Sequence, residues 1–374
     1  KDCYVLWKRK EPFNDLLQGT LEFAKEKPED SDFHLATDLA RSIPDFKNRL
    51  AKQLMMEPDH SVSNGVSYWE RFIARFKKVN GFVRYRPAML RYLDDAFQTL
   101  VNDNIHYVEI RVPLSEFFDL DGNSWRDVDY LLQYRSAFEM FKAKNPSFNM
   151  RLIICESRCE SRQHILEAFH FASKMWRDEP SLVCGFDLMG EESREWPSEE
   201  IMKTLAAIRA KDTDASTIPL YLHAGETTWG NNQNVSLACE AQCKRIGHGL
   251  NLVFAPETER ILREQDIALE ICPISNQRLG YVNDLRLHPG VGYQRRGVSC
   301  VLASDDPMIF GNHGLSFDFW SVWMAWDLSL DEMRVLAGNS ILYSGLGPEQ
   351  GAKLLHDWTV QWADFERELA TQRF

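Results

Sequence analysis

The sequence has no cluster of lysine and arginine residues with interleaved aromatic residues, the pattern that follows a phosphate backbone. Its 43 basic residues are outnumbered by 55 acidic ones, and the formal net charge is −12 at pH 7. No apolar run reaches the roughly 18 residues that span a bilayer, since Asp318 and Asp327 flank even the aromatic run at 319–326. These absences argue against a nucleic-acid polymer as partner, exclude membrane insertion, and leave a small uncharged ligand open.

Other common signatures are also missing. The sequence has no G-x-S-x-G elbow, no P-loop and no G-x-G-x-x-G motif, which argues against the usual serine nucleophile and phosphate-binding loops. Its eight cysteines include no C-x-x-C and are too few for a disulfide framework. The pairs Cys155/Cys159 and Cys239/Cys243 could each meet on a helix and bind a metal, but free thiols are the simpler interpretation.

The sequence contains enough apolar residues to build a large hydrophobic core. The 374 residues are 44% hydrophobic, which suits one large α/β domain with an appendage or two ordinary domains. Residues 1–102 are mostly helical by pattern, with no obvious strand. From about residue 103, short apolar runs alternate with amphipathic segments, the rhythm of β-α units around a parallel sheet.

Seven strands are predicted, at 105–112, 151–155, 183–189, 218–223, 245–250, 268–272 and 299–303. Polar clusters follow several of them. In a closed barrel the loops after the strands converge on one face, whereas an open doubly wound sheet places its ligand at a single switch point. We therefore predict an α/β fold with a (β/α)8, TIM-type barrel: a helical N-terminal segment over 1–102, the barrel over 103–348, and an amphipathic C-terminal helix over 349–374, whose tryptophans belong to the core.

The polar clusters include histidines and carboxylates suited to metal-assisted hydrolysis. His223-Ala-Gly-Glu226 places a histidine at a strand end and a carboxylate on the next turn. His248 lies between two glycines, which allow its imidazole close approach to a ligand. Asp305 and Asp306 are adjacent carboxylates, and burying both is costly unless one faces a cation. Together they fit a metal-dependent hydrolase better than a nucleophile triad.

Five motifs in this order resemble the adenosine deaminase superfamily. They are Gly185-Phe-Asp-Leu-Met-Gly190, His223-Ala-Gly-Glu226, Gly247-His-Gly249, Cys272-Pro-Ile-Ser-Asn-Gln277 and Ser304-Asp-Asp-Pro307. Val108-Glu-Ile-Arg111, the helix around Trp69, and Phe310-Gly311 before Gly314-Leu-Ser316 are similar to the adenosine deaminase-related growth factor branch, the secreted adenosine deaminase 2 type. The resemblance runs from about Trp69 to the C-terminus, and the first sixty or so residues match only loosely.

The resemblance implies a zinc-dependent purine nucleoside deaminase and assigns a role to each motif. His223 and Asp305 would be zinc ligands, and His248 would hold and deprotonate the attacking water. Glu226 would protonate ring N1 as C6 is attacked, and Asp306 would hydrogen-bond N7. The Gly190 backbone would meet N3, and Trp69 would lie over the nucleoside pocket.

One family feature is absent. The resemblance implies two more zinc ligands from a His-x-His pair on the first barrel strand, but the sequence contains no His-x-His. None of the remaining histidines is a good substitute: His106 lies inside a predicted strand, and His164 and His170 lie in a helical stretch. The chain begins with Lys1 rather than Met and has one strand too few to close a barrel. We expect a missing upstream segment rather than a genuine loss of the pair.

Several functions stay open at this stage. The first is deamination of adenosine or 2'-deoxyadenosine; the others are a changed reaction in a protein that lost the metal pair and a receptor-binding, growth-factor-like role. The few basic residues near the motifs favour a nucleoside over a nucleotide. The resemblance implies secretion and allows a homodimer, while a cytoplasmic location stays open. The sequon Asn234-Val-Ser236 is too weak a signal to establish secretion.

Overall fold

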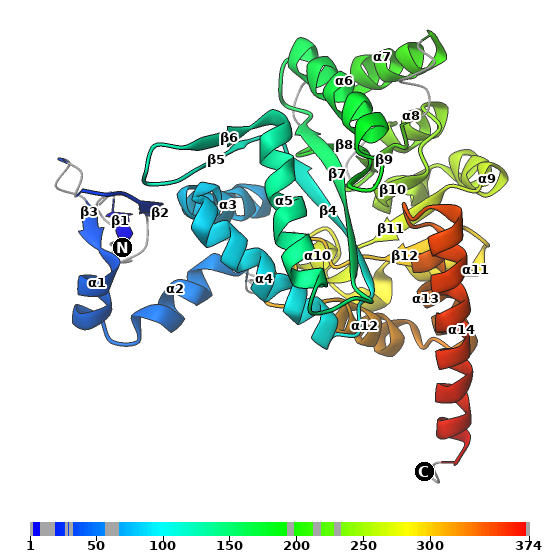
Figure 1. The fold of residues 1–374 in the computed structure, drawn as a ribbon. Helices are drawn as coiled ribbons and strands as arrows, with labels where there is room; N and C mark the ends of the chain where they lie inside the picture. The colour runs from blue at the N-terminus through cyan, green and yellow to red at the C-terminus, as the bar shows by residue number, and fades with distance from the viewer. Residues whose placement is uncertain are drawn as a thin grey trace.

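Seven parallel strands form the centre of the molecule (Figure 1). The computed structural model describes residues 3–7, 19–26, 29, 33–56, 67–192, 198–211, 218–227 and 233–371. The strands are β4 (Tyr107–Pro113), β7 (Asn149–Ser157), β8 (Val183–Met189), β9 (Tyr221–Ala224), β10 (Arg245–His248), β11 (Ala268–Ile271) and β12 (Cys300–Leu302). They lie where the apolar runs predict strands, and the barrel-type α/β fold is confirmed.

The strands follow one another in sequence order around the array. β4, β7 and β8 form one parallel sheet and β9 to β12 form another, and a parallel bridge between Phe186 and Leu220 connects the two. The outer edges of the array are β4 and β12. Among the described residues no strand is hydrogen-bonded to either edge.

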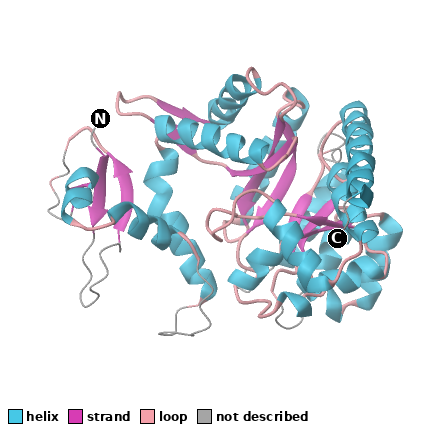
Figure 2. Cartoon of the chain, turned by 90° about the horizontal axis from the view of Figure 1, so that it is seen from below, coloured by secondary structure: helices cyan, strands magenta, loops and turns pink. Residues whose placement is uncertain are grey.

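Helices cover the outside of the strands, as the two views of the ribbon show (Figures 1 and 2). Strands that are buried on both faces need such a cover, and β10 and β11 are buried along their whole length. The covering helices are α5 (Asp127–Lys142), α6 (Arg162–Asp178), α7 (Ser198–Lys211), α8 (Asn234–Glu240), α9 (Pro256–Gln265), α11 (Gly290–Arg295), α12 (Ser316–Trp326) and α13 (Leu330–Leu342).

The N-terminal region contains a small sheet, so the prediction that it has no strand is wrong. β1 (Cys3–Trp7) pairs antiparallel with β2 (Gly19–Phe23) and β3 (Phe33–Leu35). These strands pair short segments that lie far apart in the sequence, and such pairing leaves no local pattern. Figure 2 shows the sheet apart from the barrel strands. A Cβ atom at Gly81 would lie 2.6 Å from the backbone oxygen of Leu21, so only glycine allows α3 to approach β2 this closely.

The other N-terminal elements are helical, as the pattern predicts: α1 (Ala36–Ser42), α2 (Phe46–Leu54), α3 (Tyr68–Arg84) and α4 (Arg86–Asn102). Ser67 and Glu70 form a capping box at the start of α3, with each side chain accepting the other residue's backbone N–H. A hairpin of β5 (Glu116–Phe118) and β6 (Ser124–Arg126) follows β4.

The C-terminal helix α14 (Pro348–Thr371) forms as predicted, but its tryptophans are not core residues. None of its residues is buried, and Trp358 and Trp362 are half-buried. Trp358 approaches Gly338 of α13, while the end of the helix extends past the rest of the molecule in Figure 1. Its apolar stripe correctly predicts an amphipathic helix on the outside, but helical spacing alone does not show how deeply such a stripe is buried.

Charged side chains, and not only apolar ones, fill the interior of the array. Arg111 donates to Glu270 at 2.7 Å, and Arg245 donates to the other oxygen of Glu270 at 2.6 Å and to Glu109. Burial alone would raise the pKa of Glu270, but Arg111 and Arg245 lower that pKa to about 2. The result is a connected set of buried ions in which each charge has an opposite partner.

Replacing Arg245 with Met should therefore destabilise the fold by about 3–5 kcal/mol, because buried Glu270 would lose one of its two guanidinium partners and Glu109 would lose its guanidinium partner. Urea unfolding followed by circular dichroism measures the change. Arg260→Met, on the exposed face of α9, removes an equally long charged side chain and should leave the urea midpoint unchanged. Equal midpoints for the Arg245 variant and the unmodified protein would contradict the structural role of these buried charges.

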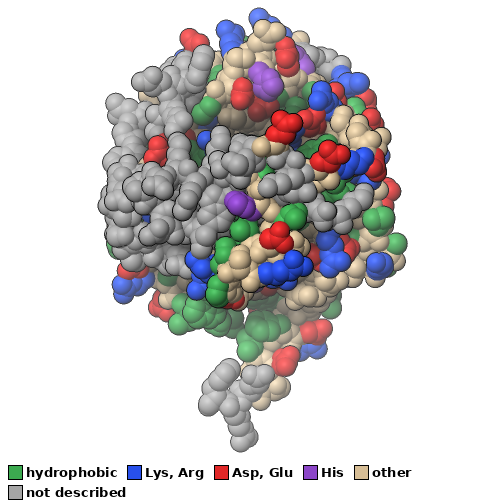
Figure 3. Space-filling model, turned by 90° about the vertical axis from the view of Figure 1, so that its left-hand side faces the viewer, with side chains coloured by type: hydrophobic (Ala, Val, Ile, Leu, Met, Phe, Trp, Pro, Cys, Tyr) green, Lys and Arg blue, Asp and Glu red, His purple; other side chains and the backbone are tan. Residues whose placement is uncertain are grey.

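Acidic and basic residues are both common in the sequence, and both occur on the outer surface of the described part of the chain (Figure 3). On the face drawn in Figure 3, acidic and basic side chains are interspersed and not separated by sign. Within the same part of the chain, no helix has both the length and the apolar character needed to cross a membrane.

Candidate active site

All seven residues predicted for the site line one large cavity, which extends from the carboxyl ends of the strands to residues of α14 such as Trp358 and Trp362. Strands β9 and β10 contribute His223 and His248, the loops after β8, β9 and β12 contribute four more residues, and Trp69 comes from α3. They are Trp69, Gly190, His223, Glu226, His248, Asp305 and Asp306. In a barrel this face is where the loops converge, so residues separated by more than two hundred positions meet there.

His223, at the end of β9, is held by Asp187 of β8. Its Nδ1 lies 2.7 Å from Oδ2 of Asp187, and its backbone N–H donates to Oδ1 at 2.9 Å. Although Asp187 is fully buried, His223 and Arg111 hold its pKa well below the usual range. The ionised carboxylate accepts the Nδ1 proton, which leaves Nε2 of His223 to bind a metal. A carboxylate behind the imidazole is typical of histidine metal ligands.

The sequence predicted no role for Asp187, although it belongs to one of the motifs. The available signal was a carboxylate within the otherwise apolar run of β8. Arg111 provides its second partner, with Nε 2.6 Å from Oδ2.

Replacing Asp187 with Asn should lower zinc affinity and activity about 10- to 100-fold, because an amide holds the imidazole less strongly and removes the negative charge behind it. Zinc titration with a competing chelator measures the affinity. Asp364→Asn, on the exposed face of α14, is the matched control and should bind zinc as the unmodified protein does. An Asp187 variant with unchanged zinc affinity would show that the carboxylate does not support the ligand.

Glu226 lies on a loop that is fixed on both sides. The buried carboxylate of Glu192 accepts the backbone N–H of Gly225 at 2.7 Å and that of Thr227 at 3.3 Å. Gly225 has φ +71°, and a Cβ atom there would lie 2.3 Å from Oδ1 of Asn251. Both constraints orient Glu226 into the cavity. The sequence predicted no role for Glu192, because its partners are more than thirty residues away.

The environment of Glu226 suits a proton donor. Its side chain is buried, and Nε2 of His248 lies 3.6 Å from its Oε1. Burial raises the pKa of Glu226 to about 7; His248 opposes this increase, while the nearby charges of Asp305 and Glu192 add to it. A carboxyl group that titrates near neutral pH can hold a proton and release it to a substrate.

Asn234, the asparagine of the sequon, helps to hold the loop that carries Glu226. Asn234 is buried, and its Nδ2 donates to Glu192 at 2.9 Å. Glycosylation would require this nitrogen to face solvent, so the structure gives the sequon no weight as a sign of secretion.

His248 and Asp305 both have left-handed backbone conformations, with φ of +67° and +57°. Such conformations cost free energy in residues other than glycine and are concentrated at functional sites. With Cys272 they form a group of three side chains whose potential ligand atoms lie within 4.8 Å of one another. His223 is not a member of that group, but its ring centroid lies 5.1 Å from that of His248.

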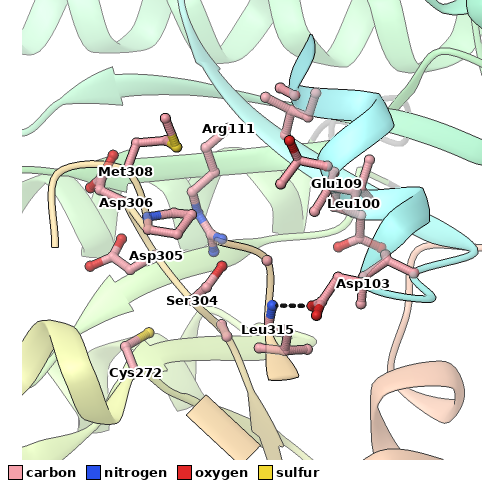
Figure 4. A pocket seen from close by; sticks show the side chains of 18 of the residues that line it. Leu100, Asp103, Glu109, Arg111, Cys272, Ser304, Asp305, Asp306, Met308 and Leu315 are labelled. Atoms are coloured by element: carbon pink, nitrogen blue, oxygen red, sulfur yellow. Dashed lines mark hydrogen bonds between the residues drawn. The ribbon is translucent and has the colours of Figure 1, made fainter. Parts of the chain in front are cut away.

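Asp305 and Asp306 follow each other in the loop after β12 (Figure 4). Ser275 donates to Oδ2 of Asp305 at 2.7 Å. Burial, the neighbouring Asp305 and Glu226 raise the pKa of Asp306 well above its usual value. A protonated Asp306 can donate a hydrogen bond, so the two adjacent carboxyl groups are suited to different roles.

The walls of the cavity include the remaining two predicted residues. Gly190 follows β8 with φ +107°, a conformation that glycine adopts at little cost. Trp69 packs against Phe72 with ring centroids 5.4 Å apart and lines the cavity.

The side chains present fit a zinc ion. Imidazole and carboxylate are ordinary zinc ligands, and Asp187 already fixes His223 in the tautomer that a metal requires. The seven cysteines whose side chains are described are free thiols, and neither predicted cysteine pair belongs to a metal-binding group among the described residues.

A parallel barrel with histidine, glutamate and aspartate at its strand ends has the architecture of the metal-dependent hydrolases. Residues 35–359 match the family model for adenosine deaminase, and the chain belongs to the adenosine deaminase family. The expected branch is confirmed as well, since relatives named adenosine deaminase 2 match most of the chain.

Two of these relatives give the extent of the similarity. The chain is 32% identical over 364 residues to adenosine deaminase 2 of Dictyostelium discoideum, which covers 94% of the chain and 66% of that protein. It is 30% identical over 342 residues to adenosine deaminase 2 of Homo sapiens, covering 89% of the chain and 66% of that protein. The chain thus spans just under two thirds of the length of these relatives.

A solved structure shows the same fold. The Arabidopsis ADAL protein in complex with IMP has a TM-score of 0.65 at 19% identity, covering 88% of this chain and 91% of that one. At this level of identity the similarity concerns the barrel alone.

Proposed function

We propose that the protein catalyses the zinc-dependent hydrolytic deamination of a purine nucleoside, converting adenosine or 2'-deoxyadenosine to the corresponding inosine and ammonia. The observation that carries this proposal is the position of Glu226. It is a buried carboxyl group able to hold a proton near neutral pH, and it faces the cavity shared by His223 and Asp305.

His223, through Nε2, and the carboxylate of Asp305 would be this chain's zinc ligands. When bound, zinc supplies Lewis acidity that lowers the pKa of water towards about 7. The two histidines of the His-x-His pair that the family resemblance implies are not in this sequence. His223 and Asp305 are therefore the part of the ligand set that can be tested in this chain.

The other side chains would recognise the purine ring and its leaving group. Glu226 donates its proton to ring N1 as a water oxygen attacks C6, and its carboxylate then takes one proton of that water. The other water proton passes to the amino group, which leaves as ammonia as the C6–N bond breaks and the C6 carbonyl forms. Asp306, with its raised pKa, donates a hydrogen bond to N7. The backbone of Gly190 meets N3, and Trp69 covers the nucleoside.

Substrate selection is part of the proposal. The five motifs contain no lysine or arginine, so they offer no positive charge to bind a 5'-phosphate. We therefore expect adenosine and 2'-deoxyadenosine to be turned over in preference to the nucleotide.

The test uses the natural full-length protein loaded with zinc. Loss of ultraviolet absorbance is followed with adenosine, 2'-deoxyadenosine and adenosine monophosphate. We expect turnover of the nucleosides and little of the monophosphate. Turnover of the monophosphate alone would overturn the assignment of substrate, and no turnover of any of the three at saturating zinc would overturn the proposed reaction. Secretion and a homodimer, which the family resemblance suggests, are tested by recovery from culture medium and by sedimentation.

A further inference from the structure

Behind His248 lies a line of buried polar side chains to which the proposed reaction gives no role. Asn276 belongs to α10 (Pro273–Arg278), and His288 follows η2 (Leu285–Leu287), two residues before α11. His248, Asn276 and His288 are each at most 1% exposed. Because so deeply buried polar groups must satisfy one another, their hydrogen bonds determine where each proton lies.

The first proton position follows from the backbone. The N–H of Gly290 can only donate, and it lies 3.0 Å from Nδ1 of His288. Nδ1 of His288 is therefore the acceptor and carries no proton. Burial, together with nearby His248, lowers the pKa of His288 to about 3, so this imidazole is neutral and its single proton is on Nε2.

The second position follows from the first. Nε2–H of His288 lies 3.1 Å from the side-chain oxygen of Asn276, which accepts it. The orientation of the Asn276 amide is thereby fixed, and its nitrogen lies 3.2 Å from Nδ1 of His248. An amide nitrogen donates and does not accept, so Nδ1 of His248 must provide the lone pair.

We propose that Asn276 and His288 are positioning residues that hold His248 in the tautomer protonated at Nε2, so that His248 acts on the reaction as a hydrogen-bond donor and not as a base. The lone pair of the neutral ring faces Asn276, away from the cavity. The Nε2–H faces Oε1 of Glu226, 3.6 Å away. This revises the role in deprotonating water that the family resemblance implies for His248.

The functional part of this inference rests on the proposed deamination, whereas the tautomer does not. A donor at Nε2 can bind a lone pair of the oxygen that adds to C6, and it can bind the carbonyl oxygen of protonated Glu226. It cannot take a proton at Nε2, since that nitrogen already carries one. Asn276 and His288 would then affect the rate of the reaction more than the binding of substrate.

The direct test is nitrogen NMR of the zinc-loaded full-length protein labelled with 15N-histidine. His248→Gln assigns the His248 signals. We expect the Nδ1 signal of His248 to be that of an unprotonated nitrogen and the Nε2 signal that of a protonated one. A protonated Nδ1 would overturn the proposal whether or not the protein deaminates adenosine.

Variants test whether the two positioning residues set the tautomer. Asn276→Asp replaces the amide donor with a carboxylate acceptor and should move a proton to Nδ1 of His248, lowering kcat at least tenfold with little change in KM. His288→Leu removes the donor to Asn276 and should have the same direction of effect, whereas His288→Gln, which can still donate, should restore most of the rate. His170→Gln, on the exposed side of α6, is the control and should change neither signal nor rate.

The outcomes separate the two proposals. An unprotonated Nδ1 in a protein that does not turn over a purine nucleoside would contradict the proposed function and support the tautomer assignment. Turnover with Nδ1 still unprotonated in Asn276→Asp would show that Asn276 does not control His248.

Discussion

Glu226→Gln should lower kcat for adenosine by about 10²- to 10⁴-fold, the usual contribution of a general acid. Glutamine has nearly the same shape and can keep the contact with His248, but it has no proton to give to ring N1. We expect zinc content and the circular dichroism spectrum to match those of the unmodified protein, because Glu226 is not among the proposed ligands. Steady-state kinetics with adenosine, alongside metal analysis, measures both properties.

Glu264→Gln is the matched control for this variant. Glu264 lies on the outside of α9, where it pairs with Arg260, and its replacement should leave kcat unchanged. If Glu226→Gln and Glu264→Gln were equally active, Glu226 would not be the proton donor and the central step of the proposed mechanism would be wrong.

Asp305→Ala should remove both zinc and activity. Asp305 is one of the two ligands this chain offers, so we expect the zinc content of the purified protein to fall from one equivalent towards zero, with kcat/KM at least about 10³-fold lower. Elemental analysis and adenosine kinetics test the two effects separately.

The matched control for Asp305→Ala is the same replacement at an aspartate that is exposed and outside the site. Asp331→Ala, in the exposed first turn of α13, should retain zinc and activity. Retention of a full equivalent of zinc by Asp305→Ala would contradict the assignment of Asp305 as a ligand, and restored activity at high zinc would show that it contributes affinity alone.

The barrel strands could be predicted because each is a local pattern. Apolar runs such as 183–189 are followed directly by the polar residues that face the cavity, so strand and site are encoded in the same stretch. The N-terminal sheet could not be predicted in this way. Its pairing of Cys3–Trp7 with Gly19–Phe23 and Phe33–Leu35 joins short, separated segments, and pairing of this kind leaves no local signal.

The residues that touch substrate in the proposed mechanism were predictable from motifs, whereas those that hold them in place were not. Asp187 and Glu192 act directly on residues 36 and 33 positions away. His288 acts on His248 through the side chain of Asn276. Their roles depend on which atoms face one another, and periodicity does not carry that information. The division of the chain at residues 102 and 348 stays a prediction.

The most direct test of the account is the release of ammonia from adenosine by the natural full-length protein containing one equivalent of zinc. The account predicts one ammonia and one inosine for each adenosine consumed, with the reaction lost in Glu226→Gln at unchanged zinc content. No release of ammonia from adenosine or 2'-deoxyadenosine by the zinc-loaded protein would contradict it.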